Sequence, residues 1–105
     1  MLAWFSAPRS ALYCAAKAAS WSLTNSIRQD LHAQGTQVLA LHVGYMDTDM
    51  TAGIDAPKSS PDDVAAQVMD GLEADAFEVL ADELSRNVRA ALSADLTALY
   101  PVLAS

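Results

Sequence analysis

The sequence predicts an α/β fold in which helices alternate with parallel strands. Apolar positions recur every three or four residues from about residue 11 to residue 34, and again after residues 60 and 82, which is the period of a helix with one apolar face. Two short apolar runs, at 36–43 and 77–80, lie between these segments and have the composition of strands. The order helix, strand, helix, strand, helix is typical of a layered α/β fold with right-handed crossovers.

The chain is long enough for one small domain. It has 105 residues, of which 52% are hydrophobic, so it can bury a core. Only two strands are evident in the sequence, however, and a two-stranded sheet is marginally stable on its own. We therefore expect the two strands to be part of a larger sheet.

The first helix is expected to begin at about Ala11 and to end before Gly35, because glycine adopts the left-handed geometry beyond a helix end at little cost. Its alanine and leucine face should pack on a sheet, most of which the chain lacks. The apolar positions along the helix are Leu12, Ala16, Ala19, Leu23, Ile27 and Leu31.

The first strand, Thr36–Val43, is nearly continuously apolar, as is usual for a strand covered on both faces. Gly44–Ser59 is predicted to be a loop. The second strand, Phe77–Leu80, is shorter and is expected to run parallel to the first.

The other two helices carry start signals. Ser60 is a candidate cap for a helix that begins at Pro61, and Asp82 is a candidate cap for a helix from about Glu83 to Leu99. The apolar faces of these helices consist of Val64, Val68 and Leu72 in the former and of Leu84, Val88, Leu92, Leu96 and Leu99 in the latter.

The charge and the cysteine content argue against several classes of function. The formal net charge of −7 argues against nucleic-acid binding and against a polybasic membrane anchor, because both need a basic surface. No apolar run is long enough to span a bilayer. The single cysteine, Cys14, makes an internal disulfide impossible, argues against a zinc site and fits a cytoplasmic protein.

Tyr13 and Lys17 are candidates for a chemical role. They lie four residues apart on the first helix and therefore project from the same face. A phenol holds its proton to about pH 10, and a nearby ammonium stabilises the phenolate. Tyrosine can then act as a general acid towards a carbonyl that accepts hydride, or as a base in the reverse reaction. Because no side chain supplies hydride, this chemistry requires a cofactor.

Other reactive or aromatic side chains are interpreted as packing residues. His42 lies in an apolar strand, and Trp4 and Trp21 are candidates for core or interface packing. Cys14 follows Tyr13 and is interpreted as a small packing residue of the helix.

The surroundings of the Tyr13–Lys17 pair resemble those in the short-chain dehydrogenase/reductase family. Ser10-Ala11-Leu12-Tyr13-Cys14-Ala15-Ala16-Lys17 is similar to the family's active-site helix, which carries a Tyr-x-x-x-Lys motif. The expected glycine and buried strand follow, and Gly44-Tyr45-Met46-Asp47-Thr48 resembles the family's Pro-Gly-x-x-x-Thr loop. Several features in the expected order cover roughly the whole chain.

The resemblance implies roles for five residues. Tyr13 would be the proton donor, and Lys17 would stabilise its phenolate and hydrogen-bond the nicotinamide ribose. Gly44, Met46 and Thr48 would flank the nicotinamide of NAD or NADP. The implied reaction is hydride transfer between an alcohol and a carbonyl on a small-molecule substrate.

The same resemblance implies a partial Rossmann-like, doubly wound fold in which residues 1–105 form the C-terminal half of one domain. The family's catalytic serine would fall just before Met1, its glycine-rich phosphate-binding turn has no counterpart in the chain, and its proline before Gly44 is Val43 here. We therefore expect the chain alone to show no turnover and no tight binding of NAD(P).

Two other interpretations stay open. The chain could be a catalytically inert, truncated protein that self-associates, or a small acidic helical adaptor. In the truncated form, one edge of the strand at Val38–Val43 and the outer face of the first helix would lack their usual cover. We therefore expect a homo-oligomer, in which copies of the chain cover these surfaces.

Overall fold

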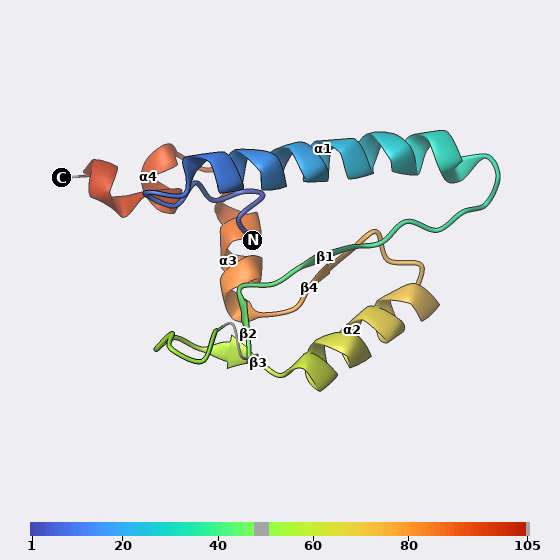
Figure 1. Ribbon diagram of the computed structural model, residues 1–105. Helices are drawn as coiled ribbons and strands as arrows, with labels where there is room; N and C mark the ends of the chain where they lie inside the picture. Colours follow the sequence, from blue (N-terminus) through green and yellow to red (C-terminus); the bar gives the residue numbers. More distant parts are fainter. Residues whose placement is uncertain (48–50, 105) are drawn as a thin grey trace.

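The computed structural model describes residues 1–47 and 51–104 (Figure 1). Its elements in chain order are α1 (Ala11–His32), β1 (Ala40–His42), β2 (Tyr45–Met46), β3 (Lys58–Ser59), α2 (Pro61–Glu73), β4 (Glu78–Leu80), α3 (Glu83–Ala91), α4 (Leu96–Leu99) and the 3₁₀ helix η2 (Pro101–Ala104). β1 and β4 pair in parallel, with Ala40 opposite Glu78 and His42 opposite Leu80. The predicted α/β fold with parallel strands is therefore confirmed.

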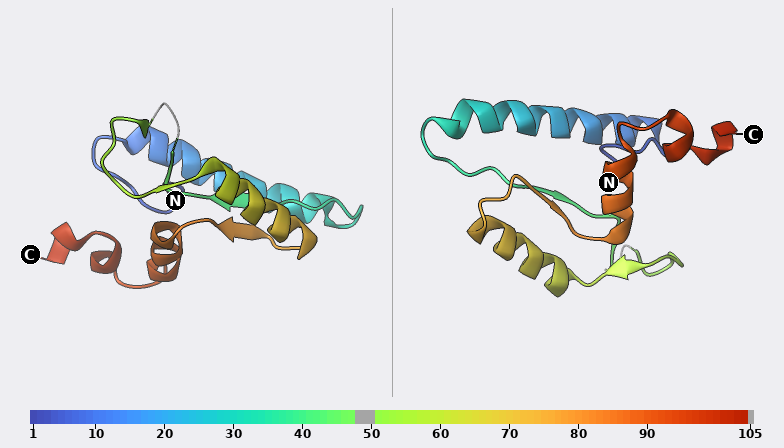
Figure 2. Two further views of the ribbon diagram at one scale, coloured as in Figure 1. Left: turned by 90° about the horizontal axis from the view of Figure 1, so that it is seen from below. Right: turned by 180° about the vertical axis from the view of Figure 1, so that it is seen from behind.

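The elements form three layers (Figures 1 and 2). α1 lies along one side of the β1–β4 pair and α2 lies along the other side, while α3 stands beside the carboxyl ends of the strands. The small core lies between α2 and the strands. It consists of Val64, Val79 and Ala81, with Leu39, Val43 and Met46 packed against them.

The predicted helix starts are confirmed at atomic level. The Ser60 hydroxyl accepts a hydrogen bond of 3.1 Å from the backbone N–H of Asp63, which satisfies one of the unpaired donors at the start of α2. The Asp82 carboxylate accepts a hydrogen bond of 2.8 Å from Ser85 N–H at the start of α3. Gly35, with a φ of 76°, follows the end of α1 in the left-handed conformation expected of it.

Three predictions about the extent of the elements were wrong. The last helix does not run to Leu99 but ends at Ala91, because Asp95 adopts an extended backbone (φ −60°, ψ 148°) and caps a separate short helix through the N–H of Thr97. The predicted loop Gly44–Ser59 contains a short parallel pairing of β2 with β3. The first strand is also shorter than Thr36–Val43, because its partner β4 begins only at Glu78, opposite Ala40.

Much of the apolar face of α1 is uncovered in this chain. Leu12 is 88% exposed and Leu23 61% exposed. The partly buried side of α1 instead carries polar and aromatic side chains, among them Trp21 and Arg28. Their partners are a carboxylate of β4 and two backbone carbonyls just before the strands, which apolar side chains could not satisfy.

The chain exposes more surface than a compact domain of its size. Its accessible area is 7305 Å², whereas a compact monomer of 11.1 kDa exposes roughly 5,700 Å². Its radius of gyration of 15.1 Å likewise exceeds the roughly 13 Å of a compact chain of about 100 residues. The elements seen here therefore leave apolar faces uncovered.

Candidate functional site

The first turns of α1 hold the Tyr13–Lys17 pair. The Lys17 ammonium nitrogen lies 5.5 Å from the centre of the Tyr13 ring, as their spacing on one helical face requires. The Tyr13 side chain is 55% exposed. The phenol is thus accessible to a ligand and has a cation beside it.

A cavity of about 420 Å³ lies against this pair. Tyr13 and Lys17 line it from α1, and His42 and Gly44 line it from the carboxyl end of β1 and the residues just beyond. Ligands of open α/β sheets bind beyond the carboxyl ends of the strands, which is where this cavity lies. Three of the five residues singled out from the sequence therefore share one cavity.

Gly44 is held in place by Asp82. The N–H of Gly44 donates a hydrogen bond of 2.6 Å to Asp82 Oδ2, and a Cβ at this position would lie 2.9 Å from the same oxygen. The close approach explains why a residue without a side chain occupies this position. Burial raises the pKa of Asp82, but hydrogen bonds from Ser85 and Gly44 outweigh burial and hold the pKa below its usual range.

The other two predicted cofactor residues have different surroundings. The Met46 side chain packs against the core between α2 and the strands, and its carbonyl accepts a hydrogen bond of 2.5 Å from the Thr51 hydroxyl. Thr48 lies outside the described residues, so its position relative to the cavity stays a prediction.

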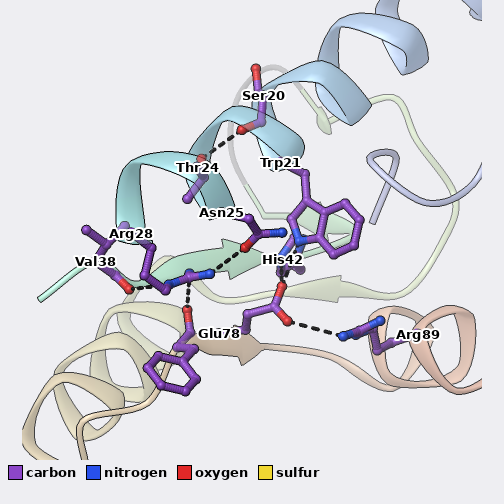
Figure 3. Close-up of polar contacts among 10 residues, drawn as sticks. Ser20, Trp21, Thr24, Asn25, Arg28, Val38, His42, Glu78 and Arg89 are labelled. Carbon is purple, nitrogen blue, oxygen red and sulfur yellow. Dashed lines mark hydrogen bonds and ion pairs between the residues drawn. The ribbon is translucent and has the colours of Figure 1, made fainter. Parts of the chain in front are cut away.

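A glutamate behind the cavity connects three elements (Figure 3). Glu78 Oε2 accepts a hydrogen bond of 2.9 Å from the Trp21 indole N–H and lies 2.8 Å from His42 Nε2, while Oε1 lies 3.5 Å from the Arg89 guanidinium. Trp4 stacks on His42, with 3.9 Å between the ring centres. We call these five residues the Glu78 cluster.

The protonation states within the Glu78 cluster follow from its geometry. Burial raises the pKa of Glu78, but hydrogen bonds from Trp21 and His42 outweigh burial and hold the pKa below the ordinary 4.5. Burial lowers the pKa of His42 below 6.5, against the opposing effect of Glu78. At neutral pH the carboxylate is therefore ionised and the imidazole neutral. An ionised carboxylate only accepts hydrogen bonds, so the proton of His42 resides on Nε2.

A second anchor fixes the far half of α1. Arg28 donates hydrogen bonds to the carbonyls of Val38 (3.2 Å) and Phe77 (2.8 Å), and also bonds the Asn25 side chain (Figure 3). Both carbonyls lie shortly before a strand. The guanidinium therefore joins the helix to the starts of β1 and β4.

Comparison with known proteins assigns the chain to a family. A family model described as short chain dehydrogenase matches residues 2–59, which include both Tyr13 and Gly44. The chain belongs to the short-chain dehydrogenase family. The resemblance inferred from the motif around Tyr13 is thereby confirmed.

Two relatives illustrate how much of a short-chain dehydrogenase is present. A 1-deoxy-11-beta-hydroxypentalenate dehydrogenase from Streptomyces exfoliatus is 34% identical over an alignment of 84 residues that covers 73% of this chain and 30% of the relative. A short-chain dehydrogenase from Burkholderia cenocepacia, solved in complex with NADP, matches with a TM-score of 0.86 and 29% identity. The match covers 99% of this chain and 45% of that one, so the partial Rossmann-like fold expected from the sequence is confirmed.

The sequence analysis missed Glu78. It was assigned only to a strand, and its partners Trp21 and His42 were interpreted as packing residues. The available signal was an acidic residue between Phe77 and Val79 in an otherwise apolar strand, because a carboxylate in that setting needs buried donors.

Within residues 1–47 and 51–104, no three histidine, cysteine, aspartate or glutamate side chains gather into a possible metal site. None of the helices in the same ranges combines the length and the hydrophobicity needed to cross a membrane.

Proposed function

We propose that the chain supplies the proton-transfer residues of an NAD(P)-dependent oxidoreductase that interconverts an alcohol and a carbonyl. The observation that carries the proposal is that Tyr13, Lys17 and Gly44 line one cavity in a short-chain dehydrogenase. The Tyr13 hydroxyl donates a proton to the carbonyl oxygen during reduction and removes it during oxidation. Lys17 stabilises the phenolate between these steps.

The residues of the cavity fit a nicotinamide cofactor in part. Tyr13 and Lys17 line it with a hydroxyl and an ammonium, both of which can hydrogen-bond a ribose. The Gly44 N–H is engaged by Asp82, so the contacts expected from this loop rest on Met46 and Thr48. When bound, NAD(P) supplies or accepts the hydride. The NADP complex of the Burkholderia cenocepacia relative supports this cofactor class.

We further propose that residues 1–105 act as the C-terminal half of one Rossmann-like domain. The chain spans 30% and 45% of the two relatives, and it exposes about 1,600 Å² more surface than a compact chain of its mass. The substrate is a small-molecule alcohol or carbonyl, in line with the dehydrogenase name of the Streptomyces exfoliatus relative. The net charge of −7 and the lone Cys14 support a cytoplasmic protein that binds neither nucleic acid nor membrane.

The test compares two proteins, the 105-residue chain and the product of its reading frame extended upstream of residue 1. The chain alone should show neither turnover nor saturable enhancement of NADH fluorescence at micromolar concentration. The extended protein should oxidise or reduce members of an alcohol and carbonyl panel, and Tyr13→Phe should lower its turnover by a factor of about 10² to 10⁴.

Three results would argue against the proposal. Saturable NADH binding by the 105-residue chain would show that the missing half is not required. Unchanged turnover in the folded Tyr13→Phe variant would show that the phenol does not transfer the proton. A stop codon directly upstream of residue 1 would favour the inert, self-associating alternative.

We also propose that the isolated chain forms a homo-oligomer through α1. Leu12 and Leu23 are 88% and 61% exposed, and burying such side chains between copies removes apolar surface from water. A stable interface would bury roughly 1,000 Å² or more. Sedimentation at low micromolar concentration should detect the oligomer, and Leu23→Glu should dissociate it. Gln29→Glu introduces the same charge away from the apolar stripe and should not. A compact wild-type monomer would rule out this association.

A further inference from the structure

Glu78 is the meeting point of three elements, two of which, α1 and β1, line the Tyr13–Lys17 cavity. Its carboxylate accepts the indole N–H of Trp21 from α1 at 2.9 Å and the imidazole N–H of His42 from β1 at 2.8 Å. The Arg89 guanidinium of α3 lies 3.5 Å from the other oxygen. One side chain on β4 therefore ties a helix, a neighbouring strand and a second helix to one another (Figure 3).

The aromatic surroundings leave these groups little freedom to move. Trp4 stacks on His42 at 3.9 Å and meets Trp21 edge to face at 5.8 Å. The Arg89 guanidinium lies 5.3 Å and 5.7 Å from the two indole rings, in cation–π contact with both. His42 is only 5% exposed, and the Glu78 side chain is 20% exposed, so water competes weakly for their hydrogen bond.

The Glu78 cluster is linked to the proton-transfer residues by helix geometry. Residues four apart lie on one helical face, so Trp21 follows Lys17 by about one turn and Tyr13 by about two. The rise from Tyr13 to Trp21 is about 12 Å at 1.5 Å per residue. Because the indole N–H is bonded to Glu78, any rotation of α1 about its axis must break this bond. His42 likewise precedes Gly44 by two residues and fixes the end of β1 on the opposite side of the cavity.

Stability alone does not require an ionised group at this position. Taking a carboxylate out of water is costly, and apolar side chains of similar volume often stabilise a protein equally well. A carboxylate is distinctive because it accepts several directional bonds at once. An apolar replacement could fill the space, but it would remove the directional restraint nearest the Tyr13–Lys17 pair and leave only the Arg28 bonds in the far half of α1.

We propose that Glu78 is a positioning residue, whose hydrogen bonds to Trp21 and His42 hold the Tyr13–Lys17 face of α1 against Gly44 at the end of β1. The effect on turnover rests on the oxidoreductase function proposed above. The effect on the orientation of Tyr13 does not, and it is measured on the chain itself.

The orientation is tested by NMR of the 105-residue chain labelled at its tryptophan indoles and tyrosine rings. Trp21→Phe identifies the Trp21 indole signal. In Glu78→Leu this signal should move upfield and exchange faster with solvent, and the ring signals of Tyr13 should shift as well. Glu78→Gln keeps an acceptor oxygen and should produce smaller changes. Val64→Ala, a core change in α2, is the control for lost stability and should leave the Tyr13 signals unchanged.

Turnover is then measured in the extended protein. Glu78→Leu should lower kcat by roughly 10- to 100-fold, because displacing a reacting group by about 1 Å has effects of this size. The KM of Glu78→Leu for the cofactor should change less than about threefold. The kcat of Glu78→Gln should lie between those of the wild type and Glu78→Leu, and Val64→Ala should keep the wild-type kcat.

The outcomes separate the two proposals. Unshifted Tyr13 signals in a folded Glu78→Leu chain, or an unchanged kcat, would overturn the positioning role. Absence of turnover in the wild-type extended protein would count against the oxidoreductase function instead, while the NMR comparison would still decide whether Glu78 orients Tyr13.

Discussion

Replacing Gly71 by alanine is predicted to destabilise the protein, although alanine is the better helix former. Gly71 lies inside α2, where the replacement gains about 1 kcal/mol of helix propensity. The new Cβ would lie 2.7 Å from Val79 Cγ2 and 3.1 Å from Leu39 Cδ1. Val79 is buried and branched at Cβ, so it cannot easily rotate away. Overpacking of this kind costs about 1–3 kcal/mol, so a net loss of about 1 kcal/mol is expected.

Thermal unfolding followed by circular dichroism measures this balance. A loss of about 1 kcal/mol should lower Tm by about 4–8 °C for a chain of roughly 100 residues. Gly53→Ala is the control, because no atom lies within 4 Å of its added Cβ. Val79→Ala removes the clashing methyl group, so the double variant should cost at least about 0.5 kcal/mol less than the sum of the single variants. A higher Tm for Gly71→Ala, or strict additivity, would refute the argument.

Three further predictions concern the caps and the Glu78 cluster. Asp82→Ala should lower the free energy of unfolding by about 1–2 kcal/mol in urea titrations, because the N–H groups of Ser85 and Gly44 lose their acceptor. Asp82→Asn keeps an acceptor oxygen and should retain most of the wild-type stability. Ser60→Ala should lower the free energy of unfolding by about 1 kcal/mol in the same assay, because the backbone N–H of Asp63 at the start of α2 loses its acceptor. Acidification through pH 6.5 should destabilise the protein, because the pKa of His42 is lower in the folded chain and the unfolded chain therefore binds the proton first. In thermal melts recorded at several pH values, His42→Leu should remove this dependence of stability on pH.

Much of the fold could be predicted because its signals are local. Ser60 and Asp82 cap helices through donors only three residues away, and Gly35 ends α1 through its own backbone conformation. The break at Asp95 was missed because the leucines before and after it keep the helical spacing. The β2–β3 pairing was missed because it joins residues on either side of a polar loop, which no periodicity marks.

The candidate site divides in the same way. Tyr13 and Lys17 could be found because one helical turn connects them, and Gly44 because it follows a recognisable strand. The role of Glu78 could not be predicted, because its hydrogen bonds join it to Trp21 and His42, which lie 57 and 36 residues away in the sequence. A sequence pattern shows that a buried carboxylate needs donors, but only the folded chain shows which residues supply them.

The two faces of α1 explain why these distant bonds matter. A helix on a sheet usually turns its apolar side inward, and the hydrophobic effect then sets its rotation. In this chain the apolar side, including Leu23, is largely exposed, and the partly buried side carries Trp21 and Arg28. Burial of Cys14 favours this rotation of α1. The bonds of Trp21 and Arg28 to Glu78 and to two backbone carbonyls add directional restraints to it. Changes at Leu23 should thus alter association but not kcat, whereas changes at Trp21 or Arg28 should lower kcat even in a fully assembled protein.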